Sequence, residues 1–228
     1  AVGSEVTSLS VGDHVVIPFP IACGRCTMCT RGLTTQCEVT QNYDTGTGAS
    51  LFGYTTLYGD VPGGQAEYLR VPLADTTSIR LPDGAQVRER HLFLSDILPT
   101  AWQAVAYADV SPGDTVVVLG LGPVGQLAAR VARHRGARVI GVDPVRERRE
   151  MAARHAIVVV DNDLDTVREA VGGVGADAVI AAVGTEASGN PLVRAMQTTT
   201  ARLPKAIARP VLEATGVDRL AAIHAAID

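Results

Sequence analysis

The chain has 228 residues, of which 20 are basic and 24 acidic, giving a formal net charge of −4. This length suffices for one large domain or two small ones. The chain has no basic stripe of the kind that binds nucleic acid, and no apolar run approaches the ~20 residues that span a bilayer. Because the first residues also lack the charged and apolar segments of a signal peptide, we expect a cytoplasmic protein.

The first predicted element is a strand close to the start of the chain. A turn at 11–13 leads into the apolar residues 15–18, a pattern typical of a strand in a β-rich domain. His14 lies at the start of this strand and has no partner at metal-ligand spacing. We therefore expect a solvated or locally bonded histidine rather than a metal ligand.

All four cysteines fall within fifteen residues, in the pattern C-x2-C-x2-C-x7-C, at Cys23, Cys26, Cys29 and Cys37. Four thiolates this close together can surround one tetrahedral zinc ion and leave no position open for substrate or water. The pattern therefore predicts a structural zinc site, with Arg25 and Arg31 near enough in sequence to offset its negative charge. Two disulfides would need an oxidising compartment, which nothing in the sequence indicates, and an iron cluster is a further alternative.

The segment after the cysteines predicts little regular structure. Residues 38–62 are rich in Gly, Thr, Asn and Asp, which is typical of a long irregular surface segment. Strand character returns at 63–71 and ends at Pro72.

Residues 91–108 follow a helical pattern. Its broad apolar face is formed by Leu92, Leu94, Leu98, Trp102, Val105 and Ala106. Ser95 or Asp96 can cap the main part of this helix, and Pro99 is tolerated in its first turn.

Residues 115–143 predict a strand, a tight glycine turn, a helix and a second strand. Gly120, Gly122 and Gly125 form the pattern G-x-G-x-x-G. The first glycine permits a sharp turn, the second lets a pyrophosphate approach the backbone, and the third lets the helix lie close to the strand. The helix has one apolar face, formed by Leu127, Ala128, Val131 and Ala132, and its N-terminal amides point at the position of a diphosphate. Gly136 is predicted to end it.

Asp143 ends the second strand, residues 138–142, about 20 residues after the glycine turn. Its carboxylate is placed to accept hydrogen bonds from the two ribose hydroxyls of an adenosine, and it would repel the 2′-phosphate of NADP, so NAD is favoured. A neighbouring arginine can accommodate such a phosphate, and three follow closely, at Arg146, Arg148 and Arg149. A nucleotide-free α/β crossover with a glycine turn is the alternative interpretation.

The remaining residues predict two more strands, followed by a C-terminal tail that is helical. Residues 155–160 and 177–184 are strand-like, with a helix around 167–171 between them. Residues 198–228 contain no strand-like run, and apolar positions recur at helical spacing from Val217 to Ile227, which predicts two short helices. The predicted organisation is thus 1–110, 111–190 and a helical tail at 191–228.

The order of these parts resembles the zinc-containing medium-chain alcohol dehydrogenase family. The resemblance covers about residues 1–184 and is carried by the segments VGSEVTSLSVGDHV, GGQAEYLRVP, LSDILPTAWQAV, SPGDTVVVLGLGPVG and ARVIGVD, together with the cysteine pattern. It implies an α/β chain with a partial GroES-like β-rich domain and a structural zinc lobe. A Rossmann-type parallel-sheet domain follows, whose completeness the sequence leaves open.

The resemblance also implies the cofactors zinc and NAD. The matching NAD-binding positions are Gly120, Gly122, Pro123, Val124, Gly125, Asp143 and Arg148. The segment LSDILPT, residues 94–100, looks most like the branch of glutathione-independent formaldehyde dehydrogenases, in which its aspartate binds the catalytic zinc. Carried over, Asp96 would be a catalytic zinc ligand, while a role as helix cap is equally open.

Two departures from the family pattern qualify the expected activity. In the family the other catalytic zinc ligands, a cysteine and a histidine, lie upstream of the stretch that resembles residue 1, and no cysteine is left once the lobe is filled. After about residue 184 the sequence also departs from its relatives. We therefore expect an alcohol or aldehyde oxidoreductase that transfers hydride to NAD, with its own activity in question and no catalytic residue assigned.

The alternative is a non-catalytic nucleotide-binding remnant or assembly protein with a structural zinc. For the oxidoreductase, the expected partners are a small alcohol or aldehyde and further copies of the chain. Neither nucleic acid nor membrane is expected as a partner.

Overall fold

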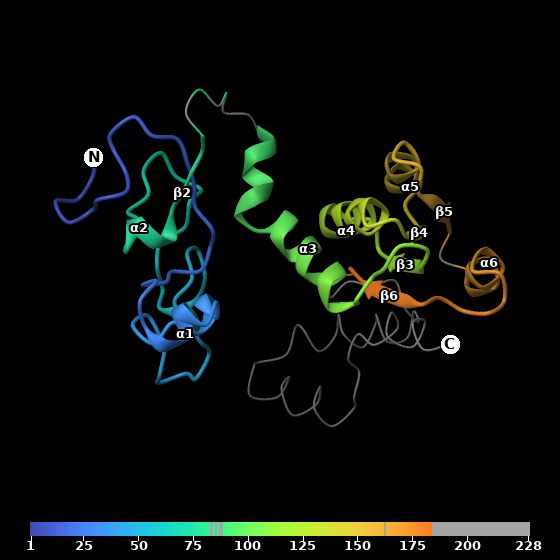
Figure 1. Cartoon of the computed structure of the whole chain (residues 1–228), viewed down its shortest axis with the longest axis horizontal. Coiled ribbons are helices and arrows are strands. Elements are labelled where there is room, and N and C mark those ends of the chain that lie inside the picture. The colour runs from blue at the N-terminus through green and yellow to red at the C-terminus, as the bar shows by residue number, and fades with distance from the viewer. Residues whose placement is uncertain (83, 85, 87–88, 162, 184–228) are drawn as a thin grey trace, which may run out of the picture. The chain divides into compact units, whose positions relative to one another are not determined.

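The computed structural model describes residues 1–82, 84, 86, 89–161 and 163–183 (Figure 1). The chain divides into two compact units, Ala1–Pro99 and Thr100–Asp228. The domain boundaries at 110 and 190 stay predictions, and the predicted helical tail at 191–228 lies outside the described residues. In the described part, no helix has the length and apolar character needed to cross a bilayer.

The first unit contains one small sheet and several short helices. Strand β1 (Val15–Val16) pairs antiparallel with β2 (Ile79–Arg80), so that Val15 lies opposite Arg80. The amide of Leu81 extends this pairing by donating to the carbonyl of His14 at 2.8 Å. The short helices are α1 (Thr27–Thr30), η1 (Thr34–Gln36), η2 (Thr56–Tyr58), α2 (Ala74–Thr77) and η3 (Glu89–Ser95). The strand predicted at 15–18 is therefore present but shorter, and His14 is exposed as expected.

The strand predicted at 63–71 is wrong. The structure has bends and irregular backbone there, and Tyr68 is 90% exposed. An extended segment becomes a strand only by pairing with a neighbour, and the described residues supply no ladder partner for this one. By contrast, residues 38–62 are irregular as predicted, with η2 and three isolated β-bridges in or at the edges of this stretch.

The helix predicted at 91–108 is interrupted. The 3-10 helix η3 ends at Ser95, Asp96 forms a turn, and α3 (Ile97–Tyr107) follows. Pro99 explains the break, because it has no amide to donate to the carbonyl of Ser95 and its ring would clash with that carbonyl in a continuous α-helix. The different periods of 3-10 and α-helices also split the predicted apolar face, so that Leu92 is exposed while Val105 is buried.

The second unit is built on a four-stranded parallel sheet with the order β5-β4-β3-β6. Its strands are β3 (Thr115–Leu119), β4 (Arg138–Val142), β5 (Val158–Val160) and β6 (Ala178–Ala181). The connecting helices are α4 (Pro123–His134), α5 (Arg146–Ala153) and α6 (Leu164–Ala170). The chain builds β4 and β5 on one side of β3 and then crosses to place β6 on the other side. The sheet therefore has its topological switch point between β3 and β6, where α/β proteins bind ligands.

The sheet core consists mainly of branched aliphatic side chains. Val117, Leu119, Ile140 and Val142 form a buried cluster, against which Val167 of α6 packs. Helix α4 contacts β3 and β4 and buries a face of small and branched residues, namely Gly125, Ala128, Ala129, Val131 and Ala132. The predicted strand at 138–142 and the helix ending before Gly136 are confirmed. The strands predicted at 155–160 and 177–184 are present in shortened form as β5 and β6, and residue 184 lies outside the described residues.

Candidate nucleotide site and zinc lobe

The glycine turn joins the end of β3 to the start of α4, and its three glycines differ in the space that surrounds them. Gly120 has φ +86°, and a Cβ there would lie 2.8 Å from Cγ1 of Val183. A Cβ on Gly125 would lie only 1.8 Å from the carbonyl oxygen of Gly120, because the helix packs directly on the turn. A Cβ on Gly122 would meet no atom within 4 Å. The turn is therefore closed on the protein side and open at Gly122, where a pyrophosphate would approach.

Helix α4 begins at this open side. Gly122 is its N-cap and Pro123 occupies the first helical position, where the missing proline amide is no loss. The next amides, those of Val124 and Gly125, belong to the first turn, which has no intrahelical acceptors. A diphosphate placed at Gly122 would meet these two donors and the positive end of the helix dipole. The NAD-binding roles of these residues stay predictions.

Asp143 is held against the glycine turn from the end of β4. Its side chain is 2% exposed, and Oδ2 accepts a hydrogen bond from the amide of Leu121 at 2.7 Å. Oδ1 accepts one from the amide of Val145 at 2.8 Å. A guanidinium nitrogen of Arg148, half-exposed on α5, lies 3.5 Å from Oδ2. The structure thus brings the glycine turn, Asp143 and Arg148 together.

Gln126 is a contributor to this site that the sequence reasoning missed. It is buried on α4, and its Nε2 donates to the carbonyl of Leu121 at 3.2 Å and to the carbonyl of Arg148 at 2.8 Å. The side chain therefore ties the glycine turn to α5. The sequence did contain a signal for this role, since Gln126 is a polar residue among the small, apolar residues on the buried face of α4. A buried side-chain amide must find hydrogen-bond partners.

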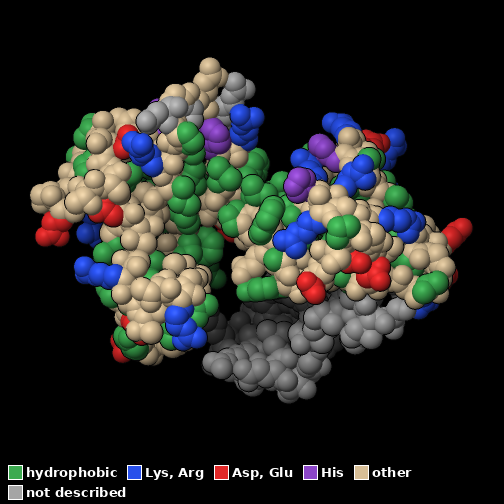
Figure 2. All heavy atoms as spheres, in the orientation of Figure 1, with side chains coloured by type: hydrophobic (Ala, Val, Ile, Leu, Met, Phe, Trp, Pro, Cys, Tyr) green, Lys and Arg blue, Asp and Glu red, His purple; other side chains and the backbone are tan. Residues whose placement is uncertain are grey.

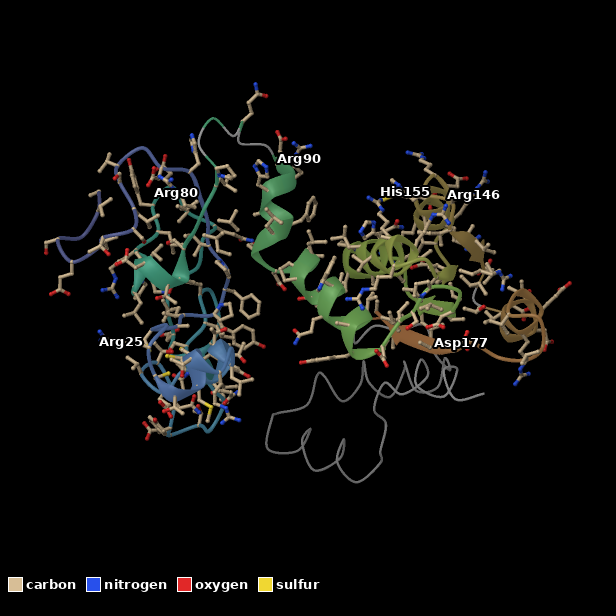
Figure 3. All side chains as sticks on the ribbon, in the orientation of Figure 1. Arg25, Arg80, Arg90, Arg146, His155 and Asp177 are labelled. Atoms are coloured by element: carbon tan, nitrogen blue, oxygen red, sulfur yellow. The ribbon has the colours of Figure 1, made fainter. Side chains whose placement is uncertain are left out.

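Arg149, which the sequence analysis considered only as a phosphate partner, faces a different group. Its guanidinium donates to the backbone carbonyl of Asp143 at 2.6 Å and lies 3.5 Å from a carboxylate oxygen of Asp161. Arg146 is labelled on α5 in Figure 3. Its exposed side chain is paired with Glu150 at 2.7 Å. These two arginines are thus engaged within the protein, and Arg148 is the one of the three that lies beside the side-chain carboxylate of Asp143.

The four cysteine sulfurs form a compact cluster around α1. All lie within 4.8 Å of one another, the Sγ atoms of Cys23 and Cys29 are 4.0 Å apart, and all four thiols are free. Four sulfurs at the usual Zn–S distance of about 2.3 Å would be separated by roughly 3.8 Å, so the cluster fits one tetrahedral zinc with slight contraction. Cys26 also caps α1, because its Sγ accepts the amide of Cys29 at 3.5 Å.

Backbone amides surround these sulfurs and favour the thiolate form. The amides of Cys26 and Cys23 donate to Cys23 Sγ at 3.4 Å and Cys37 Sγ at 3.3 Å. The amide of Cys29 lowers the pKa of Cys26. Burial raises the pKa of Cys37, but the contact with Thr40 and nearby amides outweighs it and lowers that pKa to about 6. Burial raises the pKa of Cys29 to about 12, so this thiol must release a proton when a metal binds.

Asp96, the residue implied as a catalytic zinc ligand, lies on an exposed turn between η3 and α3. Within the described ranges, the cysteine cluster is the one group of three or more ligand-type residues arranged for a metal ion. A catalytic zinc needs about three protein ligands and an open position. The described residues therefore fit a structural zinc, and they do not assemble a catalytic zinc site around Asp96.

Comparison with protein families gives two matches in the order predicted from the sequence. Residues 1–83 match the model of the alcohol dehydrogenase GroES-like domain, and residues 123–201 match that of the zinc-binding dehydrogenases. The second match extends beyond residue 184, where the sequence analysis ended the resemblance. The predicted fold class, a GroES-like part followed by a Rossmann-type parallel sheet, is confirmed.

Individual relatives agree with these matches. An uncharacterized zinc-type alcohol dehydrogenase-like protein, AdhB of Bacillus subtilis, is 43% identical over 81% of this chain and 50% of its own length. The glutathione-independent formaldehyde dehydrogenase of the same organism is 38% identical over 82% of this chain and 47% of its own length. The structure of the alcohol dehydrogenase TADH from Thermus sp. ATN1 is 37% identical, with a TM-score of 0.70 over 81% of this chain and 52% of that one.

The chain spans about half the length of these relatives. Zinc and NAD, the two cofactors predicted from the sequence, are those of this class of dehydrogenase, and the cysteine cluster is arranged to bind the former. The two family matches lead to one assignment. The two relatives at 38–43% identity and the shared fold agree with it. The chain belongs to the zinc-containing alcohol dehydrogenase family.

Proposed function

We propose that this chain supplies the structural zinc lobe and the adenosine half of the NAD site of a zinc-dependent alcohol or aldehyde oxidoreductase. The observation that carries the proposal is that the buried carboxylate of Asp143 lies directly beside the glycine turn, which is open at Gly122. The glycine turn follows β3 beside the switch point of the sheet, and Asp143 follows the neighbouring strand β4. NAD, when bound, supplies the acceptor for the hydride that the alcohol carbon releases.

The residues of the chain divide the binding of NAD between them. The amides of Val124 and Gly125 would face the diphosphate at the start of α4. Asp143 keeps lone pairs for the ribose hydroxyls beyond those that accept the amides of Leu121 and Val145. Its negative charge opposes a 2′-phosphate, while Arg148, 3.5 Å from Oδ2, reduces that opposition. On balance, NAD is preferred to NADP.

A second candidate function is a non-catalytic nucleotide-binding or assembly protein that keeps the structural zinc. The observation in its favour is that Asp96 is exposed and belongs to no group of described residues that could hold a metal ion. This candidate predicts binding of one zinc and of NAD without oxidation of an alcohol. The oxidoreductase proposal predicts that another ligand set joins Asp96 and holds a second zinc.

Zinc content measured together with turnover separates the two candidates. Elemental analysis of the full chain gives the number of zinc ions, and NADH fluorescence gives binding and the rate of oxidation of a short primary alcohol or of formaldehyde. Two zinc ions with turnover support the oxidoreductase, whereas one zinc without turnover supports the second candidate.

The variant Asp96→Ala makes this experiment sharper. In the oxidoreductase it removes the second zinc and the turnover but keeps the lobe zinc, while the exposed control Asp165→Ala keeps both. If Asp96→Ala leaves zinc content and turnover at the level of the control, Asp96 is not a ligand. The substrate is proposed to be a small alcohol or aldehyde. Assembly into a homo-oligomer and a cytoplasmic location, where thiols stay reduced, belong to the same proposal.

A further inference from the structure

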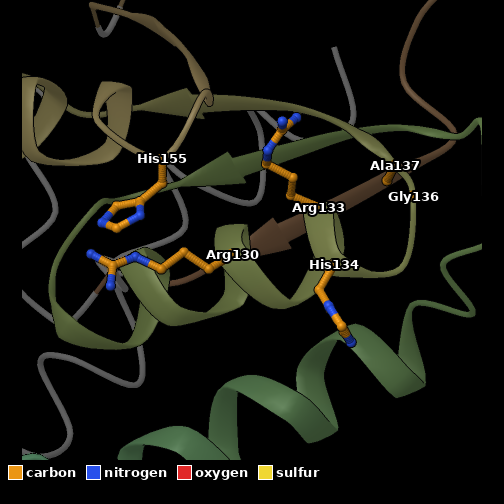
Figure 4. Close-up of a pocket in the computed structure, with 6 residues that line it drawn as sticks. All are labelled: Arg130, Arg133, His134, Gly136, Ala137 and His155. Atoms are coloured by element: carbon orange, nitrogen blue, oxygen red, sulfur yellow. The ribbon is translucent and has the colours of Figure 1, made fainter.

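A cavity of about 430 Å³ lies at the end of the sheet opposite to the glycine turn. It is lined by Arg130, Arg133, His134, Gly136, Ala137 and His155 (Figure 4). Ala137 directly precedes β4, and Arg138 at the start of β4 pairs with Thr115 at the start of β3. The glycine turn follows Leu119, the last residue of β3. The cavity and the nucleotide site therefore lie at opposite ends of the same parallel strands.

Every lining residue with an ionisable side chain is an arginine or a histidine, and no acidic residue lines the cavity. Figure 4 shows Arg130 from α4 and His155, which follows α5, pointing toward one another. Figure 2 shows histidine and arginine side chains gathered over α4 and α5 on the face in view. Arg130 is positively charged and the imidazole of His155 can donate a hydrogen bond, so an anion between them would meet donors from both side chains.

The arginines of this unit differ in how they are paired. Arg146, Arg148, Arg149 and Arg168 each lie within 4.0 Å of a carboxylate. Arg135 lies over the ring of Trp102, 5.3 Å from its centre. By contrast, within the described part of the chain, Arg130 and Arg133 have no carboxylate partner, and the Nε of Arg130 is buried without any hydrogen-bond acceptor. A buried guanidinium donor without an acceptor is unfavourable, and an oxyanion would relieve it.

The dipole of α4 accounts for only part of this cluster. Cations are favoured in the last turn of a helix, which explains Arg133 and His134. Arg130 lies one turn earlier, and His155 comes from a different element. Neither belongs to the last turn of α4, so the convergence of these two side chains on the cavity needs another explanation.

We propose that this cavity is a binding site for a phosphate-class anion, either free phosphate or the phosphoryl group of a small organic phosphate. The planar guanidinium fork of an arginine matches two oxygens of such a group, and a histidine can donate to a third. The cavity is larger than one phosphate and leaves room for an organic substituent. The site is separate from the place where the pyrophosphate of NAD would bind.

Calorimetric titration of the full, zinc-loaded chain tests the proposal. Orthophosphate and glycerol phosphate are titrated in separate experiments at constant ionic strength, with ADP-ribose in excess to fill the glycine turn. We expect saturable binding of at least one of the two at one site per chain. Preference for orthophosphate identifies free phosphate as the ligand, and preference for the ester identifies an organic phosphate.

Variants locate the binding. Arg130→Gln is expected to weaken it by about tenfold or more, the loss of one strong charge-assisted contact. Because Arg130 is half-buried and its replacement can disturb α4, the exposed changes Arg133→Gln and His155→Asn provide independent tests and are expected to weaken binding several-fold. The control Arg146→Gln removes an exposed arginine that is paired with Glu150, and it should leave binding unchanged.

Three results would overturn the proposal. The first is the absence of saturable binding of either phosphate by the wild-type chain. The second is binding that Arg133→Gln and His155→Asn leave unchanged. The third is binding that Arg146→Gln weakens as much as these two variants, which would indicate a general effect of surface charge.

Discussion

The carboxylate of Asp143 accepts a hydrogen bond from the backbone amide of Leu121 at 2.7 Å, which links the end of β4 to the glycine turn after β3. Gln126 holds the carbonyl of the same residue at 3.2 Å. The side chain of Leu121 is buried over Gly141, where a Cβ would come within 2.9 Å of it. The turn is therefore held by contacts of both the backbone and the side chain of Leu121.

Asp143→Ala is expected to lower both stability and NADH affinity. The substitution leaves two amides, those of Leu121 and Val145, without acceptors in a buried place, which corresponds to about 2–4 kcal/mol of unfolding free energy. Urea unfolding measures the change in the free energy of unfolding, and NADH fluorescence measures NADH binding in buffer without urea. The control Asp165→Ala, whose side chain is 94% exposed, should stay within about 0.5 kcal/mol of the wild type. Equal stability of the two variants would contradict the role of Asp143.

Alanine substitutions of two glycines should separate folding from binding. Gly125→Ala places a Cβ 1.8 Å from the carbonyl of Gly120, so we expect a chain that is strongly destabilised or fails to fold. Gly122→Ala meets no protein atom within 4 Å, so the chain should fold with an almost unchanged melting temperature but bind NADH more weakly. Thermal melting and NADH fluorescence measure the two effects. Normal NADH affinity in Gly122→Ala would place the pyrophosphate elsewhere.

Cys37→Ser is expected to abolish stable zinc binding by the lobe. Cys37 is completely buried, and its Sγ also accepts the amide of Cys23, so the change removes a metal ligand and weakens a local contact. Zinc analysis after dialysis should fall by one ion per chain, and residues 23–61 should become more sensitive to proteolysis. The exposed, non-ligating control His14→Ala should keep the metal. Retention of zinc by Cys37→Ser would show that the cluster is not a four-sulfur site.

Asp75 gives the first unit a pH-dependent attachment of its N-terminal segment. Its carboxylate accepts hydrogen bonds from the hydroxyls and amides of Ser8 and Thr7. The Ser8 hydroxyl is the largest of the causes that lower the pKa of Asp75, from 3.8 to about 2. Because the pKa is lowered on folding, the contribution is complete above pH 3.8 and is lost as the pH falls toward 2.

Hydrogen exchange of the Thr7 and Ser8 amides measures this attachment. Protection should be present at pH 5 and should decline below the unfolded pKa, and Asp75→Asn should reduce it at pH 5, where the wild-type carboxylate is ionised. The exposed control Asp44→Asn should leave it unchanged. Protection that is independent of pH between 5 and 2 would contradict the account.

The second unit could be predicted closely from the sequence, because local pattern and tertiary packing agree there. The β-branched run before Gly120 and the strand that ends at Asp143 are each buried on both faces, so apolar pattern and structure coincide. The spacing from the glycines to Asp143 also predicts that the turn and this carboxylate lie next to one another. Gln126 was missed because its role depends on two carbonyl groups that it meets only in the folded chain. The carbonyl of Leu121 belongs to the glycine turn, and the carbonyl of Arg148 is distant in the sequence.

The first unit was predicted less well, because its structure depends on long-range pairing and on single residues. The strand predicted at 63–71 lacks a partner among the described residues, which no local pattern can reveal. The helix around 91–108 breaks because Pro99 cannot donate to Ser95. The cysteine cluster was predicted correctly because close spacing in the sequence alone brings its sulfurs together.

Calorimetric titration with ADP-ribose tests the central claim most directly, because this molecule contains only the adenosine half of NAD with its diphosphate and second ribose. We expect saturable binding at one site per chain, competition with NADH, and weaker binding of the 2′-phosphorylated form. We also expect that Gly122→Ala weakens this binding while the fold is kept. Failure of ADP-ribose to bind the folded, zinc-loaded chain would contradict the assignment of the glycine turn and Asp143 as a nucleotide site.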